Sequence, residues 1–379
     1  MDSFLASLTA EIKNIFHSTY KLFLLFLLPF FLSFFIIEIF GDGALKDLPI
    51  AVVDKDKSTF SNKLIHAFDD TSTLHVSLCA NSLHQAIQAL QNTKVYAVVV
   101  IEKEFQNDIV KHHSPKINVF LNTQYILIGK IVFSTLSSTA MELSAQIETI
   151  QKLTKSKVLS KALSLTLPIS LKTVPLFNTY QNYFYFLVTA VLPAIWQILL
   201  TLSAIVTVAQ FHANDPKLFY SRPFTGIFAK LLPGMVVFFL WSVIFLYYIY
   251  GVHGWQFMGD MGTVLLATVL CIVAYNILGV LFYVILFDYT EALSIAAVYT
   301  APAFAFIGIT FPASDMNGFA IFWREMLPIT HLMEIFISQA NYASPLRFET
   351  ENLLLLSCFS FLSIPVLWRI RQKGTACVL

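Results

Sequence analysis

The side chains of this chain that could do chemistry gather in one short amphipathic run near the C-terminal end. Glu325, His331 and Glu334 stand there among apolar residues. His331 and Glu334 are three positions apart, so they share one face if the run is helical. An imidazole beside a carboxylate can bind a metal ion or move a proton. The spacing alone is weak evidence for either, and we favour hydrogen bonds within the run or the lining of a vestibule.

The sequence contains no recognisable enzyme active site. The phosphate-binding pattern Gly-x-x-x-x-Gly-Lys-Ser/Thr is absent, since the pair Gly129-Lys130 lacks both the upstream glycine and the following hydroxyl residue. His-Glu-x-x-His and Gly-x-Ser-x-Gly are absent too. None of the four cysteines stands at a metal-binding spacing: Cys79, Cys271, Cys358 and Cys377. We therefore expect no catalytic residue, no metal ion and no cofactor bound by the chain itself.

The composition indicates a membrane protein. Hydrophobic residues make up 57% of the chain and charged residues only 12%, against about 25% charged in soluble domains. The net charge of +1 gives no basic surface for nucleic acid. Apolar runs of spanning length recur, which predicts a polytopic α-helical membrane protein with six transmembrane helices. The expected spans are residues 22–40, 183–209, 231–250, 261–287, 292–311 and 353–367.

Two segments differ from the spans. Residues 1–21 have apolar side chains at near-helical spacing, which predicts an interfacial helix on the membrane surface. Residues 41–177 form a polar insert of domain size between spans one and two, and spans two to six occupy residues 178–379. The first span has no small-residue cleavage site after it, so we interpret it as retained and not as a signal peptide.

The insert predicts an α/β domain around a mainly parallel sheet, because short strand patterns alternate with helix patterns. Expected strands are 50–53, 74–78, 95–101 and 117–121, and expected helices are 58–68, 82–91, 104–111 and a long one from 126. Ser58 and Ser82 stand where helix N-caps belong. We interpret Asp54 and Asp56 as strand-end and turn residues in preference to metal ligands.

The distribution of lysine and arginine predicts the orientation. Six spans place both termini on one side, and three basic groups fall there: Lys13 and Lys21; Lys217, Arg222 and Lys230; Arg369, Arg371 and Lys373. The short opposite loop, residues 251–260, contains no lysine or arginine. The positive-inside rule therefore predicts cytoplasmic termini and an extracytoplasmic α/β domain.

Two motifs give the chain a family resemblance. Gly308-x-Thr310-Phe311-Pro312, followed by Leu327-Pro328-x-Thr330-His331, resembles the permease subunits of type 2 ABC transporters, the exporter class. The insert is similar to the outer domain of the subgroup with a large extracytoplasmic domain, through Val52-Val53-Asp54-x-Asp56-x-Ser58 and Val98–Phe105. In that family the first motif closes span five on the outer side, and the second leads back toward span six.

The resemblance implies a re-entrant or interfacial segment between spans five and six. Its candidate pathway residues, together with one acid on span one, are Gly308, Thr310, Phe311, Pro312, Glu325, Pro328, His331, Glu334 and Glu38.

The resemblance also assigns a coupling role to residues 211–230, because the loop between spans two and three docks the ATPase in this family. The usual acidic Gly-Thr signature is missing here and the loop is shorter, although Pro223 and Lys230 remain. The candidate coupling residues are His212, Asn214, Asp215, Lys217, Arg222 and Lys230. The alternative is a short solvated loop whose basic residues only set the orientation.

By this resemblance the chain is the membrane subunit of an ATP-driven exporter of hydrophobic, drug-like or lipid-like cargo in the cell inner membrane. A separate ATPase subunit would bind ATP-Mg, two permease chains would form a homodimer or heterodimer, and a periplasmic adaptor protein could contact the insert. Two other functions stay open: a membrane-anchored extracytoplasmic receptor, and an ion-coupled secondary transporter. A receptor would usually carry a sizeable cytoplasmic output domain, and the second class would show internal repeats around central charges.

Overall fold

The computed structural model describes residues 2–41, 43, 45–111, 115–156, 182–309 and 311–378. The chain forms two compact units. The helical unit comprises Met1–Gly43 and Tyr183–Leu379, and the α/β unit comprises Ala44–Asn182. Thr310, one of the candidate pathway residues, lies outside the described residues, as does the last part of the predicted insert from residue 157 to 177.

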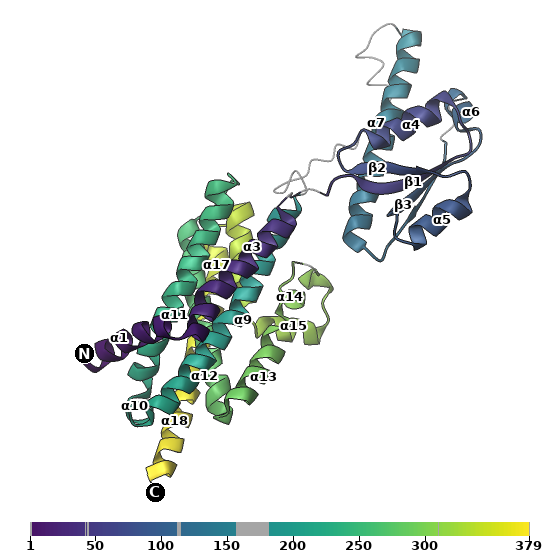
Figure 1. The fold of residues 1–379 in the computed structure, drawn as a ribbon. Helices are drawn as coiled ribbons and strands as arrows, with labels where there is room; N and C mark the ends of the chain where they lie inside the picture. Colours follow the sequence, from purple (N-terminus) through teal and green to yellow (C-terminus); the bar gives the residue numbers. More distant parts are fainter. Residues whose placement is uncertain are drawn as a thin grey trace. The chain divides into compact units, whose positions relative to one another are not determined.

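The α/β unit is a four-stranded sheet covered by helices on both faces (Figure 1). Its elements in chain order are β1 Leu48–Asp54, α4 Thr59–Asp69, β2 Leu74–Cys79, α5 Leu83–Gln91, β3 Ala97–Ile101, α6 Phe105–Val110, β4 Ile117–Leu121 and α7 Ile126–Ser156. The strand order is β2-β1-β3-β4; β1 pairs in parallel with β2 and β3, and β4 is antiparallel to β3. The predicted mainly parallel sheet is confirmed.

Strand periodicity explains the two cores of this unit. Alternate residues of β1 point to opposite faces: Ile50 packs with α4, α6 and α7, and Ala51 packs with α5. The predicted N-caps are confirmed, since the hydroxyls of Ser58 and Ser82 accept hydrogen bonds from the first turns of α4 and α5.

The aspartates after β1 make turn contacts. Asp54 Oδ1 accepts from the backbone N–H of Asp56 and of Lys57, both at 2.9 Å, and Asp54 Oδ2 accepts from Ser61 Oγ at 2.7 Å. Asp56 Oδ2 accepts from the backbone N–H of Gln106 at 3.1 Å. The turn interpretation is therefore confirmed. Among the residues that the structure describes, no group of three or more metal-ligating side chains occurs.

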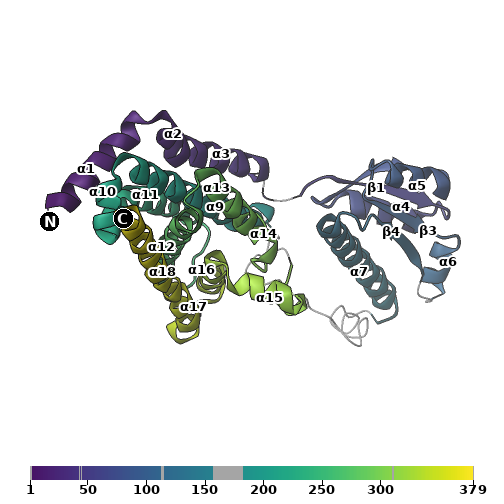
Figure 2. The same cartoon turned by 90° about the horizontal axis from the view of Figure 1, so that it is seen from below.

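The helical unit contains the remaining elements (Figures 1 and 2). They are α1 Asp2–His17, α2 Thr19–Leu22, η1 Phe23–Leu27, α3 Leu28–Phe40, α9 Tyr183–Asn214, α10 Pro216–Ser221, α11 Pro223–Leu246, η2 Tyr247–Val252, α12 Met261–Leu286, α13 Tyr289–Thr300, α14 Ala303–Phe306, η3 Ala313–Asp315, α15 Gly318–Glu325, α16 Pro328–Ile337, η4 Ser338–Tyr342, α17 Leu346–Cys358, η5 Phe359–Leu362 and α18 Ser363–Val378. The η1, η2 and η4 segments are π-helical, and η3 and η5 are 3₁₀ turns.

Five stretches of the described chain are long and apolar enough to cross a membrane. They are Thr19–Phe40, Phe184–Asn214, Pro223–Val252, Met261–Leu286 and Leu346–Thr375. Helices are therefore confirmed at five of the six predicted spans. The second and fourth stretches, formed by α9 and α12, are the most enclosed by protein.

The predicted fifth span, Ala292–Phe311, is not one continuous helix. Helix α13 ends at Thr300, and the four-residue α14 follows after a turn at Ala301-Pro302. Pro302 ends α13 because its ring nitrogen has no hydrogen to donate to the preceding turn. The 12 residues of α13 rise about 18 Å, short of the roughly 30 Å hydrocarbon core. A sixth crossing at this place stays a prediction.

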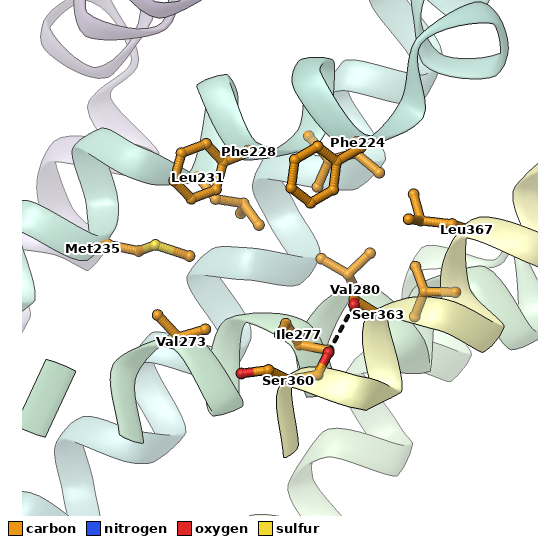
Figure 3. Close-up of a pocket in the computed structure, with 12 residues that line it drawn as sticks. Phe224, Phe228, Leu231, Met235, Val273, Ile277, Val280, Ser360, Ser363 and Leu367 are labelled. Atoms are coloured by element: carbon orange, nitrogen blue, oxygen red, sulfur yellow. Dashed lines mark hydrogen bonds between the residues drawn. The ribbon is translucent and has the colours of Figure 1, made fainter. Parts of the chain in front are cut away.

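Helix α12 lies at the centre of the unit and contacts α9, α11, α13, α16, α17 and α18. Its close approach to α9 depends on Gly279, where a Cβ atom would lie 2.8 Å from both Ala204 Cβ and the carbonyl oxygen of Thr201. On another side, α12, α11 and α18 leave an apolar groove between them (Figure 3).

Gly279→Ala should lower the free energy of unfolding by about 1–3 kcal/mol, the usual cost of overpacking. The added methyl would push α9 and α12 apart, since it meets backbone and a Cβ atom. Thermal unfolding of the purified chain in detergent measures the effect. Gly318→Ala is the control, because no atom lies within 4 Å of the position its Cβ would take. Equal melting temperatures for the two variants would contradict the prediction.

Candidate functional site

The first candidate site is the connection from α9 through α10 to α11, residues 211–230, which we call the α10 elbow. Pro216 and Pro223 stand at the first positions of α10 and α11, where a proline is tolerated because its missing N–H has no helical partner. Phe219 of α10 is fully buried and packs edge-to-face on Phe211 of α9. A Cβ atom on Gly226 would lie 2.8 Å from the Phe211 ring. The elbow is therefore tightly packed.

His212 connects this elbow to the rest of the helical unit by hydrogen bonds. Its Nδ1 lies 2.8 Å from the Tyr283 hydroxyl of α12, and its Nε2 lies 2.8 Å from the Tyr220 hydroxyl of α10. A neutral imidazole donates from one nitrogen and accepts at the other, and a hydroxyl can serve as partner to either. His212 thus links three helices and does not stand on the open surface of the elbow.

The other candidate coupling residues divide into two groups. Asn214, Asp215, Lys217 and Arg222 are exposed on the outside of the elbow. Lys230 is turned inward on α11, with its side chain 11% exposed. The structure therefore places two of the six predicted residues inside the packing and leaves four on the surface.

Lys230 belongs to a buried ion cluster that sequence reasoning missed. Glu11 of α1 is 2% exposed; it accepts a hydrogen bond from Lys21 Nζ and lies 3.3 Å from Lys230 Nζ. The cluster joins α1 to α2 and to α11, along which α1 packs. A sequence signal existed, because Glu11 stands three residues after Leu8 and four before Ile15, which places it on the apolar face of the predicted helix.

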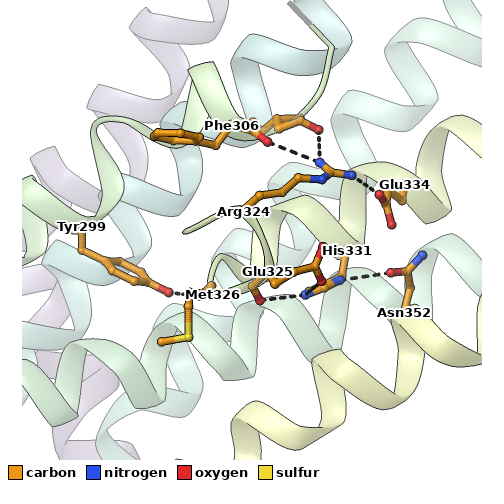
Figure 4. Close-up of polar contacts among 9 residues, drawn as sticks. Tyr299, Phe306, Arg324, Glu325, Met326, His331, Glu334 and Asn352 are labelled. Carbon is orange, nitrogen blue, oxygen red and sulfur yellow. Dashed lines mark hydrogen bonds and ion pairs between the residues drawn. The ribbon is translucent and has the colours of Figure 1, made fainter. Parts of the chain in front are cut away.

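The second candidate site follows the break after α13, and we call residues 301–340 the broken-helix segment (Figure 4). Arg324 of α15 is 4% exposed. Its Nη1 donates to the carbonyl oxygens of Ile307 at 2.8 Å and Phe306 at 3.3 Å, and its Nη2 pairs with Glu334. A cation at the C-terminal end of a helix is favourable, since the last carbonyls there lack intrahelical partners. Arg324 therefore caps α14.

Gly308 makes room for this arginine. Its φ of +91° lies in the region that favours glycine, and a Cβ atom there would lie 3.0 Å from Arg324 Nη1. The Tyr299 hydroxyl of α13 donates to the carbonyl oxygen of Met326, which ties α13 to the end of α15.

His331 is 1% exposed and is held at both ring nitrogens. Its Nε2 lies 3.1 Å from the carbonyl oxygen of Glu325, so this nitrogen carries the hydrogen, and its Nδ1 lies 3.0 Å from the Asn352 side chain of α17. His331 and Glu334 do not pair with each other. The interpretation that both make hydrogen bonds inside the segment is confirmed, and their place in a pathway stays a prediction.

The remaining predicted pathway residues are spread out. Pro328 is buried at the start of α16, whereas Phe311 and Pro312 are exposed. Glu38 is exposed near the end of α3 and lies outside the contacts described above.

A buried amide–phenol pair, also missed from the sequence, lies where α13 ends and α16 begins. The Tyr275 hydroxyl of α12 donates to Gln197 Oε1 of α9 and accepts from the backbone N–H of Ile329 at 3.3 Å. Gln197 Nε2 donates to the carbonyl oxygen of Thr300 at 3.4 Å. Both backbone groups stand at helix ends, so they need partners from outside their helices. A glutamine in the middle of an apolar span was the available signal.

The fold and these sites define a multi-pass helical membrane protein with polar contacts concentrated at helix ends. A family model described as ABC-2 family transporter protein matches residues 21–369. The chain belongs to this family and is a type 2 ABC transporter permease, the membrane component that works with an ABC ATPase partner. A search of curated proteins gave no match.

Arg324→Met should lower the free energy of unfolding by about 2–6 kcal/mol, since each of two buried carbonyl oxygens left without a donor costs roughly 1–3 kcal/mol. Two carbonyl oxygens near the end of α14 would lose their donor, and Glu334 would lose its cation. Glu334→Gln should cost only about 1 kcal/mol, because its side chain is 42% exposed and Arg324 keeps both carbonyl contacts. Thermal unfolding in lipid nanodiscs compares the two variants, and an equal loss would show that Arg324 does not act as a helix cap.

Glu11→Gln should destabilise the chain by about 3–5 kcal/mol, since it leaves the ammonium groups of Lys21 and Lys230 without their carboxylate. Lys13→Gln is the matched control: Lys13 lies on the exposed side of α1, where a substitution changes stability by about 0.5 kcal/mol or less. Unfolding of both variants in the same detergent measures the difference. A Glu11→Gln protein as stable as the control would contradict the role of the cluster.

Proposed function

We propose that this permease belongs to an ATP-driven exporter and that its separate ATPase subunit binds the α10 elbow from the cytoplasm. The observation that carries the proposal is the construction of this elbow. A short helix stands between two long apolar helices, presents charges of both signs outward through Asp215, Lys217 and Arg222, and is fixed to its surroundings by buried aromatic side chains.

The packing supports transmission of force from a partner into the helical unit. Phe219 and the His212 contacts join α10 to α9 and α12, and Tyr220 also packs against Gly374 of α18. Because close-packed interiors transmit strain, a displacement of α10 would move several helices together. A solvated loop that only sets the orientation would need none of these contacts.

The orientation and the other partners follow from the same proposal. Lys217 and Arg222 lie at the end of the helical unit that the positive-inside rule places in the cytoplasm, which puts the α/β unit outside. The partner ATPase would hold ATP-Mg, and two permease chains would assemble as a homodimer or heterodimer.

The α/β unit would be available to a periplasmic adaptor protein, and the cargo would be hydrophobic and drug-like or lipid-like. Family membership favours this reading over a receptor or an ion-coupled transporter.

Replacing Lys217 and Arg222 together by alanine should reduce the amount of ATPase that co-purifies with the tagged permease at least about fivefold, if each interfacial cation contributes roughly 0.5–1 kcal/mol. Quantitative mass spectrometry of the detergent-purified complex gives the ratio of ATPase to permease. Vanadate-sensitive ATP hydrolysis by the same sample gives a second readout.

The matched control replaces Lys13 and Arg369 by alanine, which removes two exposed positive charges from the same predicted side but outside residues 211–230. This control should retain the ATPase. The docking assignment fails if both double variants keep the partner in equal amounts, and the permease function itself fails if the unaltered chain copurifies with no ATPase.

A further inference from the structure

The groove between α11, α12 and α18 shares Phe224 and Phe228 with the α10 elbow but none of the candidate coupling residues (Figure 3). Its volume is about 240 Å³. Its walls are almost entirely apolar and include Phe224, Phe228 and Met235 of α11, Val273 of α12, and Ser363 and Leu367 of α18. The Ser363 hydroxyl donates to the carbonyl oxygen of Ser360 at 2.7 Å, so it is already satisfied and offers no unpaired donor to a ligand.

The size of the groove matches a hydrocarbon chain. An apolar cavity of about 150 Å³ holds a benzene-sized molecule, so this groove has room for a longer aliphatic segment. Phe224 and Met235 are eleven positions apart on α11, which corresponds to a rise of about 16 Å, roughly half of the ~30 Å hydrocarbon core. The groove therefore has about the depth of one leaflet.

The groove opens on the surface of the helical unit, where acyl chains would surround a membrane-spanning helix. Phe224 is 61% exposed and Phe228 41% exposed, on a stretch of α11 that is apolar enough to span the bilayer. Both lie in the first turns of α11, in the last part of the α10 elbow. The groove thus lies in the leaflet on the side of the elbow and of the C-terminal helix.

A positive charge continues the wall of the groove on α18. Ser363, Leu367 and Arg371 are spaced by four residues, so they stand on one face of that helix. The first two line the groove, and Arg371 is exposed one turn beyond it. Trp368, 62% exposed, lies beside this end, and exposed tryptophans are typical of membrane–water interfaces.

We propose that this groove binds one acyl chain of an anionic phospholipid, with the phosphate of its headgroup against Arg371. The apolar walls provide the binding of the chain, and the arginine provides the preference for negative charge, because a cation at the membrane surface attracts anionic headgroups. The lipid would fill the space between α18 and α11 and hold the C-terminal helix in place. The proposal depends on the chain spanning a membrane and is independent of ATPase docking.

The test uses the full chain in nanodiscs with equal amounts of phosphatidylcholine and phosphatidylglycerol that carry the same acyl chains. A photoreactive phenylalanine analogue replaces Phe228 at the groove, or Leu240, an exposed residue of α11 outside the groove lining. After irradiation, mass spectrometry identifies the adducts. We expect about fivefold enrichment of phosphatidylglycerol adducts at position 228, the preference that one surface cation gives, and adducts in the bulk ratio at position 240.

Three further variants distinguish the contribution of the apolar walls from that of the positive charge. Arg371→Gln should abolish the headgroup preference at position 228, whereas Arg369→Gln, an exposed cation two residues earlier on the same helix, should leave it unchanged. Val273→Phe fills the groove and should reduce phospholipid adducts of both kinds at position 228 but not at position 240.

Three results would overturn the proposal. One is an adduct ratio at position 228 equal to that at position 240. Another is a loss of preference in Arg369→Gln equal to that in Arg371→Gln. The third is an adduct with a second copy of the chain or with another protein in place of phospholipid, which would make the groove a protein interface. None of these results bears on copurification of the ATPase.

Discussion

The helical unit depends on how it satisfies the backbone groups released at the break after α13. A carbonyl or N–H without a partner costs several kcal/mol in an apolar environment, where water cannot replace the lost hydrogen bond. Gln197 donates to Thr300, Tyr275 accepts from Ile329, and Arg324 caps the carbonyl oxygens of Phe306 and Ile307. These three side chains allow an irregular backbone to persist inside a helical bundle, so the segment after the break is held in place by the helices around it.

Helix α12 joins the two candidate sites. Tyr275 reaches the end of α13 through Gln197 and the start of α16 through Ile329, and Tyr283 contacts His212 in the α10 elbow. The two tyrosines are eight residues apart on one continuous helix, or about 12 Å along its axis. A displacement at the elbow would therefore reach the break through a rigid element. Two-state movement of this element would be the physical basis for coupling a partner's ATP cycle to a passage through the unit.

More of the secondary structure could be predicted from the sequence in the α/β unit than in the helical unit, for physical reasons. In the α/β unit, strands and helices followed local patterns: alternation along β1, continuous apolar residues in β3, and serine caps before α4 and α5. In the helical unit, hydropathy located five spans but could not show that Pro302 ends α13, since prolines also occur inside α9 and α11, at Pro193 and Pro233. A long apolar run indicates that a segment lies in an apolar environment. It does not indicate whether the helix is continuous through that segment.

The buried charged residues of the helical unit were also not predicted from the sequence, and their contacts explain why. Glu11 and Arg324 are nearly fully buried, and each is matched by partners that are distant in sequence or reached through backbone carbonyls. Because an unpaired buried charge is strongly destabilising, these residues fix the positions of α1 and α15. Lys217 and Arg371 are exposed at the same end of the unit, where a charge adds little to folding stability. The role of charges of this second kind is therefore better sought in binding, which we propose for a protein at the elbow and for a lipid headgroup at α18, than in the stability of the fold.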